Sequence, residues 1–385
     1  MSQLPADQLA EVDRLVQAQQ LPQAAQLLEH LLKNYAGDVQ HWLHLAGLRR
    51  ALRQPHRALE AVHQALALSP SDFMALVMRA SLLERMQHPT AGIAWKDALA
   101  LCPAENIPPP LAAALEQGRA FLAQWEAQRS ERLQQATAQA EANCDEEDAR
   151  WRIARFRSNV LGLTKVYHST PTHFHYPGLE EREYHPRRRF PWLAEVEAAA
   201  PAIRAELEAL MQSQRAELVP YIQYGAHEPL AQWRALNHNP DWTAIHLLQR
   251  GTRIAQNADA CPTTMALLAR LPQPDIPGAS ANAMFSLLAP RTTIPAHVGV
   301  NNTRLLCHLP LIVPQGCWFR VGAETRFWQE GQAFIFDDTC EHEAANPSDQ
   351  LRVVLIFDIW HPDLTPPEQD AVRALIIAEG GQKGD

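Results

Sequence analysis

The chain has 385 residues, of which 46% are hydrophobic and 20% are charged, and its net charge is −9. This composition is that of a globular protein with room for roughly two or three domains. The acidic balance disfavours nucleic acid or an anionic membrane as the main partner, because both bind basic surfaces. A local basic patch remains compatible with the total charge; the triplet Arg187-Arg188-Arg189 is interpreted as a solvated turn.

The cysteines and the first residues indicate the cellular compartment in which we expect the protein. Six cysteines are scattered along the chain without a CxxC pair, which is typical of a reducing compartment. The first residues lack the basic and apolar stretches of a signal peptide, and no run of about 18 apolar residues predicts a membrane span. We therefore expect a soluble, cytoplasmic protein.

Residues 1–106 contain an internal repeat. Segments that start at Pro22, Pro55 and Pro89 align with steps of 33 and 34 residues. Such a period, with small residues where paired helices cross, resembles the tetratricopeptide repeat. Three units fit, at about 5–38, 39–72 and 73–106. Because a single hairpin cannot bury its apolar face, hairpins stack and leave a groove. We expect this groove to bind a peptide or protein partner; dimerisation or docking is the alternative.

Residues 107–165 are predicted to be a helical connector. The run Pro108-Pro109-Pro110 interrupts the repeats. From Leu111 to Leu161 the chain is free of proline and rich in Ala, Gln, Glu and Arg. This composition predicts long helix, with a break near Asn143-Cys144-Asp145. Another helix is predicted from about Ala194 to Ala216.

From Met284 onward the pattern is that of β-structure, with short runs of Val, Ile, Leu and Phe between turn residues. The candidate strands are Ala283–Leu288, Thr303–Ile312, Cys317–Val321, Ala333–Phe336 and Arg352–Ile359. Short strands without intervening helices favour an antiparallel barrel or jelly roll. Residues 166–385 are therefore predicted to form a separate domain.

Three residues of this β region point to chemistry. His297 follows a predicted strand, and His342 lies in a polar turn. Arg352 begins an otherwise apolar strand, where a guanidinium requires an anion, best a carboxylate held by two parallel hydrogen bonds. This ordered set matches 2-oxoglutarate oxygenases, whose metal keeps positions open for the keto acid and oxygen. Any single histidine of the 17 is more often a surface or core residue, so the prediction depends on the set.

Residues from about Phe190 to Leu364 resemble the aspartyl/asparaginyl β-hydroxylase family, most specifically from Ser286 onward. The matching stretches are His297-Val298-Gly299, Asn302-Thr303-Arg304, His308-Leu309-Pro310-Leu311, Gly331, Phe336-Asp337-Asp338, Glu341-His342-Glu343, Arg352 and Trp360-His361-Pro362-Asp363-Leu364. Animal members also carry a tetratricopeptide-like N-terminal region. The resemblance implies a double-stranded β-helix (jelly-roll) catalytic domain that uses Fe(II), 2-oxoglutarate and O2 to hydroxylate an unactivated C–H bond. The chain as a whole is then a multidomain α + β protein.

One position departs from most non-haem iron oxygenases, as it does in this family. The acidic ligand expected two residues after the first histidine is replaced by Gly299. The resemblance thus implies a metal held by His297 and His342, with water in the third place. A substitute carboxylate from Asp338 or Glu341 is the alternative. Loss of an anionic ligand should weaken iron binding in the absence of co-substrate.

The co-substrate contacts are also implied by the resemblance. Arg352 and Ser286 match positions that hold the distal carboxylate of 2-oxoglutarate. His308 matches a position near the metal-proximal carboxylate, and Trp242 matches an aromatic residue of the pocket. Asp337 and Asp338 are expected to orient the loop or a metal-bound histidine.

One of these contacts differs from the family pattern. Animal members have an arginine where this chain has Leu306. Strand alternation places Arg304, Leu306 and His308 on one face. We hypothesise that Arg304 replaces the missing arginine.

The sequence leaves the substrate open. The favoured interpretation is hydroxylation of the β-carbon of Asp or Asn in a peptide or protein recruited by the helical repeats. A small molecule, a carrier-bound amino acid or a lipid acyl chain is the second possibility, and the absence of a membrane anchor disfavours the lipid. A third is a repeat scaffold without catalytic activity, which retention of His297, His342 and Arg352 argues against.

Overall fold

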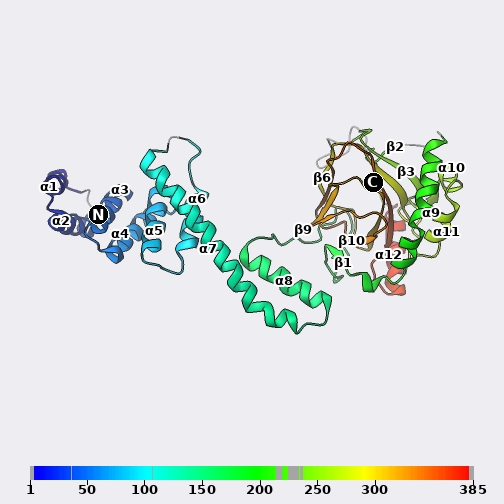
Figure 1. The fold of residues 1–385 in the computed structure, drawn as a ribbon, viewed down its shortest axis with the longest axis horizontal. Helices are drawn as coiled ribbons and strands as arrows, with labels where there is room; N and C mark the ends of the chain where they lie inside the picture. Colours follow the sequence, from blue (N-terminus) through cyan, green and yellow to red (C-terminus); the bar gives the residue numbers. More distant parts are fainter. Residues whose placement is uncertain are drawn as a thin grey trace. The chain divides into compact units, whose positions relative to one another are not determined.

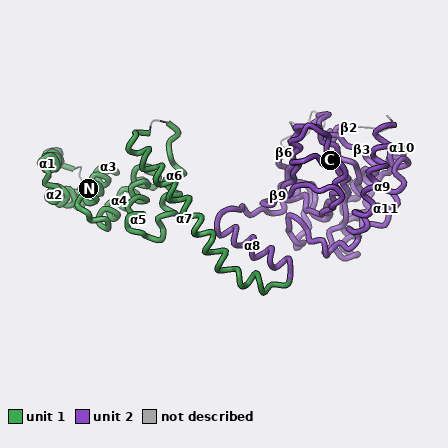
Figure 2. Tube along the Cα trace, viewed as in Figure 1, with its two compact units in different colours: residues 1–145 green, residues 146–385 purple. Residues whose placement is uncertain are grey.

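The computed structural model describes residues 4–35, 37–105, 107–213, 219–223, 234 and 237–380. The chain divides into two compact units, residues 1–145 and 146–385 (Figure 2). The border between the units falls inside the predicted connector. No described helix is long and apolar enough to cross a membrane.

The first unit consists of helical hairpins (Figure 1). Its helices are α1 (Ala6–Gln17), α2 (Leu21–Asn34), α3 (Val39–Ala51), α4 (Pro55–Leu68), α5 (Phe73–Arg85), α6 (Ala91–Ala100) and α7 (Pro109–Ala142). Asp38 and Asp72 start the second and third hairpins, and their side chains accept hydrogen bonds from the backbone N–H groups of His41 and Ala75. These caps satisfy donors that a helix start leaves open. Each predicted repeat contains one hairpin, so the helical repeat is confirmed.

Small residues lie where the helices of this unit cross. Ala24, Ala58 and Ala80 are fully buried, next to leucines such as Leu28. Alanine allows two helix backbones to approach, while the leucines supply the apolar area that stabilises the stack. The small residues recognised in the sequence repeat therefore have a packing role.

The predicted connector forms two helices. The first is α7, and the second is α8 (Glu147–Leu161), which belongs to the second unit. The residues between them include Asn143, Cys144 and Asp145, so the predicted break is confirmed. Gly162 ends α8 in the left-handed conformation with φ of 73°, which favours glycine.

The second unit contains two antiparallel sheets. The larger one has the order β1 (Tyr184–His185), β10 (Phe334–Phe336), β7 (Arg304–Ile312), β12 (Arg352–Trp360), β5 (Ala283–Leu288), β3 (Trp242–Gln249) and β2 (Val219–Pro220), with β4 (Thr252–Arg253) paired to β3. The smaller one has the order β6 (Thr292–His297), β11 (His342–Asn346), β8 (Trp318–Val321) and β9 (Glu324–Phe327). All five predicted strands are present. Strands β6 and β11 were not predicted, because one contains a proline and the other is mostly polar or small.

Helices α9 (Leu193–Gln212) and α11 (Pro262–Leu268) pack against the outer face of the larger sheet. The second unit also contains η1 (Arg187–Arg189), α10 (Ala255–Ala258) and α12 (Pro366–Ala378). The arginine triplet is a turn as predicted, but its three side chains pair with Glu197, Asp148, Glu180 and Asp363. The triplet is therefore a turn in which Arg187 and Arg188 are exposed, as predicted, and its side chains also form ion pairs.

Strand alternation sorts the residues of the larger sheet into two sets. Odd-numbered residues, such as Leu305, Phe285 and Leu355, form a core with α9 and α11. Even-numbered residues of the same strands, such as Val354 and Ile356, pack against the smaller sheet. Successive strand residues point to opposite faces, so even positions such as Ser286, His308 and Arg352 are directed to the space between the sheets.

Candidate active site

Two histidines from neighbouring strands of the smaller sheet lie side by side. His297 ends β6, His342 begins β11, and the two residues are partners in the strand register. Their ring centroids are 4.0 Å apart. The structure thus brings together the two residues that the sequence predicts as metal ligands.

Each histidine ring is held by a carbonyl group two residues earlier. His297 Nδ1 lies 2.7 Å from the carbonyl oxygen of Pro295, and His342 Nδ1 lies 3.0 Å from that of Cys340. A carbonyl oxygen only accepts, so Nδ1 carries the proton and donates. The lone pair of each neutral ring is then on Nε2, which is the arrangement common in metal-ligating histidines.

Both rings are kept neutral by their surroundings. Burial lowers the pKa of His342 to about 4. Burial, together with the adjacent His342, lowers the pKa of His297 well below its ordinary value. Because a histidine must be deprotonated to bind a metal, these shifts keep both residues competent as ligands at neutral pH.

The side chain missing at Gly299 is replaced in space by a carboxylate from another segment. A Cβ added at Gly299 would lie 2.3 Å from Asp338 Oδ2. Asp338 Oδ1 is buried without a hydrogen-bond partner, and Oδ2 lies 3.4 Å from the guanidinium of Arg304. Glu341, the other carboxylate considered, pairs instead with Arg320 at 2.9 Å. Across the described residues, no third His, Cys, Asp or Glu completes a metal-binding group.

A small cavity extends from the histidine pair into the space between the sheets. It is lined by His297, His342, Arg352, Ser286, Trp242, His308, Leu306, Tyr221, Trp328 and other apolar residues. Every residue predicted to hold the co-substrate lines this cavity, with the exception of Arg304.

Arg352 supplies the positive charge of the small cavity. Its side chain is 3% exposed, and it forms no ion pair with any carboxylate of the described residues. Burial lowers the pKa of Arg352 to about 10, so the group stays charged at neutral pH. Its guanidinium lies 5.4 Å from the ring centroid of Trp328. A buried cation without an anionic neighbour strongly favours an anionic ligand.

Polar groups flank Arg352 in the same cavity. Trp242 Nε1 donates to Ser286 Oγ at 3.0 Å, which leaves the serine hydroxyl proton to donate elsewhere. His308 Nδ1 is buried without a partner. Burial and the charge of Arg352 lower the pKa of His308 well below its ordinary value. The cavity therefore offers a charged fork, a hydroxyl and a neutral imidazole to a carboxylate.

A larger cavity lies on the other side of the histidine pair. It shares His297, His342, Leu306, Tyr221 and Ile356 with the small cavity, and adds Arg304, Asp338, Asp358, His246, Asn282 and Met284 among others. Burial and Asp358 raise the pKa of Asp338, while Arg304 opposes this rise. Asp358 is held by Ser280 Oγ at 2.8 Å and by the backbone N–H of Asn282 at 2.9 Å. Unlike the small cavity, the larger one thus contains carboxylates beside its cation Arg304.

Comparison with known proteins finds a family match in the second unit. Residues 197–362 are similar to the aspartyl/asparaginyl beta-hydroxylase family. The match contains His297, His342 and the residues that line both cavities within this range.

Three relatives indicate how far the similarity of this hydroxylase-family domain extends. The ornithine lipid ester-linked acyl 2-hydroxylase of Rhizobium tropici is 39% identical over 180 residues, which cover 46% of this chain and 60% of that protein. The aspartyl/asparaginyl beta-hydroxylase of Homo sapiens is 35% identical over 142 residues, 36% of this chain and 18% of that protein. The human aspartate beta-hydroxylase domain-containing protein 2 is 36% identical over 156 residues, 39% of this chain and 42% of that protein. The chain thus spans less than two thirds of each relative.

Sequence reasoning missed three residues of the hydroxylase-family site. The ring of Trp328 stacks on His308, with centroids 5.5 Å apart. Tyr221 stacks on Trp242 at 3.9 Å. His246, on β3, lines the larger cavity, and burial lowers its pKa to about 4. Trp328 and Tyr221 lie just after the short strands β9 and β2 and give no periodic signal, so only the folded structure shows these contacts.

Proposed function

We propose that this chain is an Fe(II)- and 2-oxoglutarate-dependent dioxygenase that hydroxylates an unactivated C–H bond. The observation that carries the proposal is the position of the neutral His297–His342 pair between two cavities. One cavity contains the buried cation Arg352, and the other is large enough to be lined by eighteen residues from several strands. A metal on this pair would contact the contents of both cavities.

The residues present fit an iron ion. His297 and His342 would hold it through Nε2, and the buried carboxylate of Asp338 stands where a third ligand's side chain is absent at Gly299. The bound iron and 2-oxoglutarate together supply the activation of O2, with oxidative decarboxylation of the keto acid. A carboxylate without a hydrogen-bond partner on Oδ1 is suited to accept from a metal-bound water or to offset the metal charge.

The small cavity fits a dicarboxylate. We assign the distal carboxylate to Arg352 and Ser286, because a planar fork and a hydroxyl satisfy two carboxylate oxygens at a time. His308 would lie beside the carboxylate nearer to the metal, and Trp242 forms the wall. The apolar residues around these groups exclude water, which strengthens every charged contact inside.

Arg304 has two proposed roles that an experiment separates. If it replaces the arginine absent at Leu306, Arg304→Ala weakens the binding of 2-oxoglutarate. Its position in the larger cavity, 3.4 Å from Asp338, favours a role in holding that carboxylate beside the metal. An unchanged 2-oxoglutarate affinity together with weakened iron binding would select the second role.

We propose the β-carbon of a peptidyl Asp or Asn as the substrate, in line with the human relative named for that activity. The helical repeats would recruit the peptide. A lipid acyl chain is the second candidate, and the observation in its favour is the 180-residue similarity to the ornithine lipid acyl hydroxylase. Because Arg304 is paired inside the larger cavity, that cavity does not demand an acidic substrate. We propose a cytoplasmic location, because the six cysteines are scattered along the chain without a CxxC pair, which is typical of a reducing compartment.

The test is a succinate assay with the purified chain, Fe(II), ascorbate and 2-oxoglutarate. Substrate candidates are Asp- or Asn-containing peptides in one series and acyl amino-acid lipids in the other, with product mass measured for a gain of one oxygen. The preferred substrate should raise succinate release over the uncoupled background. If neither iron-dependent turnover nor 2-oxoglutarate binding were found, the proposal would be wrong.

A further inference from the structure

After the acidic residues Glu146, Glu147 and Asp148, the second unit contains a segment whose charge is opposite to that of the whole chain. Residues 149–179 contain no aspartate or glutamate, although the chain has a net charge of −9. The same segment has five basic residues: Arg150, Arg152, Arg155, Arg157 and Lys165. A local excess of positive charge of this size attracts anionic surfaces over about one Debye length.

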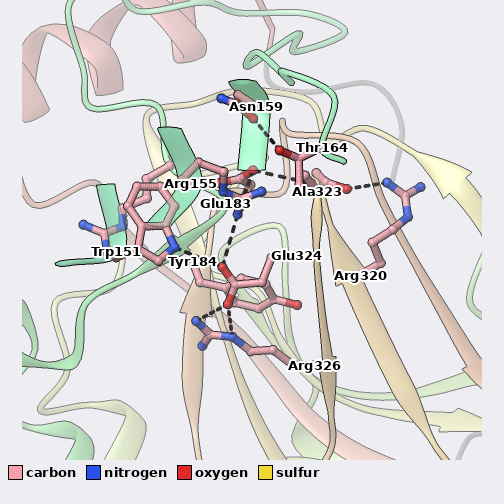
Figure 3. A network of polar contacts seen from close by, with 12 residues as sticks. Trp151, Arg155, Asn159, Thr164, Glu183, Tyr184, Arg320, Ala323, Glu324 and Arg326 are labelled. Atoms are coloured by element: carbon pink, nitrogen blue, oxygen red, sulfur yellow. Dashed lines mark hydrogen bonds and ion pairs between the residues drawn. The ribbon is translucent and has the colours of Figure 1, made fainter. Parts of the chain in front are cut away.

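One face of α8 is fixed to the β-domain of the second unit. Trp151 Nε1 donates to Glu324 at 3.3 Å, and Arg155 lies 3.4 Å from both Glu324 and Glu183 (Figure 3). Asp148, near the start of the helix, pairs with Arg182 at 3.0 Å. These side chains come from positions spaced by three or four residues, so they share one face of the helix. The contacts attach α8 to the domain that contains the two cavities.

The rest of this segment exposes large apolar side chains. Phe156 is 69% exposed, Val160 42%, Leu163 72% and Val166 58%. Phe156 and Val160 follow each other at a spacing of four residues, so they lie on one side of α8 that differs from the attached one. Among the described residues, no other stretch of similar length exposes as many large apolar side chains.

The basic residues are interleaved with these apolar ones. Arg152 and Lys165 are exposed; Arg152 precedes the apolar set in the sequence, and Lys165 lies between Leu163 and Val166. Apolar side chains that project beside Arg and Lys are the pattern of a helix that lies in a membrane interface, where the apolar groups enter the acyl region and the cations meet lipid phosphates. A second copy of this chain has a net negative charge and would therefore also be attracted to these cations. Dimerisation, however, does not explain why the segment contains no acidic residue.

We propose that the surface formed by Arg152, Phe156, Val160, Leu163, Lys165 and Val166 binds the interface of an anionic lipid bilayer. Because α8 is attached to the β-domain by the contacts of Figure 3, binding there holds the catalytic unit at the bilayer. The binding is peripheral, in agreement with the absence of a membrane-spanning helix among the described residues. It does not depend on iron or on hydroxylation, so it stands or fails independently of the proposed activity.

The experiment is sedimentation of the metal-free full-length chain with vesicles of phosphatidylcholine alone or phosphatidylcholine mixed with phosphatidylglycerol. We expect binding to the mixed vesicles and little to the neutral ones. Phe156→Asp with Leu163→Asp should reduce binding by about tenfold or more, since two apolar groups no longer enter the interface. Arg152→Glu and Lys165→Glu should each reduce it about fivefold or more, and added salt should act in the same direction.

The matched control is Leu375→Asp on α12, where an equally exposed side chain (66%) lies outside this surface. It should leave vesicle binding unchanged, and circular dichroism should show that every variant is folded. Absence of wild-type binding to phosphatidylglycerol vesicles would overturn the proposal. So would equal binding to neutral vesicles, or unchanged binding of the double Asp variant. A dimer in gel filtration that Phe156→Asp dissociates, without vesicle binding, would assign the surface to a second copy.

Discussion

The two cavities that meet at His297 and His342 differ in how their charges are balanced. In the small cavity, Arg352 is buried and forms no ion pair with the described carboxylates. In the larger one, Arg304 lies 3.4 Å from the carboxylate of Asp338, and Asp358 lines the same cavity. An unbalanced buried charge determines its ligand, because only an anion repays the desolvation of the cation. A cation that already has a carboxylate beside it restricts the charge of a ligand much less.

This difference explains why the residues suggest a class of co-substrate and leave the substrate open. The small cavity fits an anion, and a carboxylate next to the histidines is our proposal. The larger cavity combines polar groups such as Asn282 and His246 with apolar ones such as Met284, and so accepts several chemical classes. Four experiments test the comparison, from the largest expected effect to the smallest.

The largest effect is expected at the boundary shared by both cavities. His297→Ala or His342→Ala should abolish iron-dependent succinate release, because one remaining imidazole cannot hold the metal. Iron binding measured by titration should be lost in parallel. His246→Ala in the larger cavity is the control and should retain iron binding. Retained turnover in both single variants would remove the histidine pair from the site.

The next effect separates the two arginines. Arg352→Gln should weaken 2-oxoglutarate binding about a hundredfold, since the fork that meets the carboxylate is lost. Arg304→Gln, its match in the larger cavity, should have a clearly smaller effect on that affinity. Calorimetric titration of the two variants measures the difference. Equal losses would mean that both arginines contact the co-substrate, as the hypothesis of compensation at Leu306 requires.

A third test addresses the close approach of Gly299 and Asp338. Gly299→Ala places a methyl group 2.3 Å from the carboxylate, so a backbone or side-chain shift is required. We expect a loss of about 1–3 kcal/mol in unfolding free energy and weaker iron binding. Gly47→Ala, in α3 with open space around the added Cβ, is the control and should stabilise by about 0.5–1 kcal/mol. Thermal unfolding would measure both, and an unperturbed Gly299→Ala would contradict the packing described.

The smallest effect is a pH dependence in the larger cavity. Burial lowers the pKa of His246 from 6.5 to about 4. The unfolded chain therefore binds this proton first, and stability is lost as pH falls from 6.5 towards 4. The loss is at most about 1.4 kcal/mol per pH unit. In His246→Gln, the unfolding free energy should fall less steeply between pH 6.5 and 4, and its pH dependence above pH 7 should be unchanged. Denaturant unfolding at a series of pH values measures both. Identical slopes for variant and wild type would show that His246 is not buried as described.

Much of this protein is determined by local sequence. The 34-residue repeat predicted the helical hairpins, and lack of proline with a polar break predicted α7 and α8. Runs of apolar residues predicted strands such as β5 and β12. Because these strands are buried on both faces, their apolar residues form nearly continuous runs in the sequence. The order of His297, His342 and Arg352 identified a candidate metal and anion site. The side chains in these signals are close in the chain, so their spacing is readable without the fold.

Tertiary structure alone decided how the site is completed. The carboxylate of Asp338 occupies the space of a side chain at Gly299, and Trp328 joins His308 and Arg352 across two sheets. The tertiary structure also places Arg304 in the larger cavity. Its position on the strand had suggested a place beside His308, which lines the small cavity. Such contacts depend on strand pairing between residues far apart in the chain, and a local pattern does not record which segments meet. The sequence therefore predicts the class of chemistry, whereas the fold decides which charged groups line each cavity.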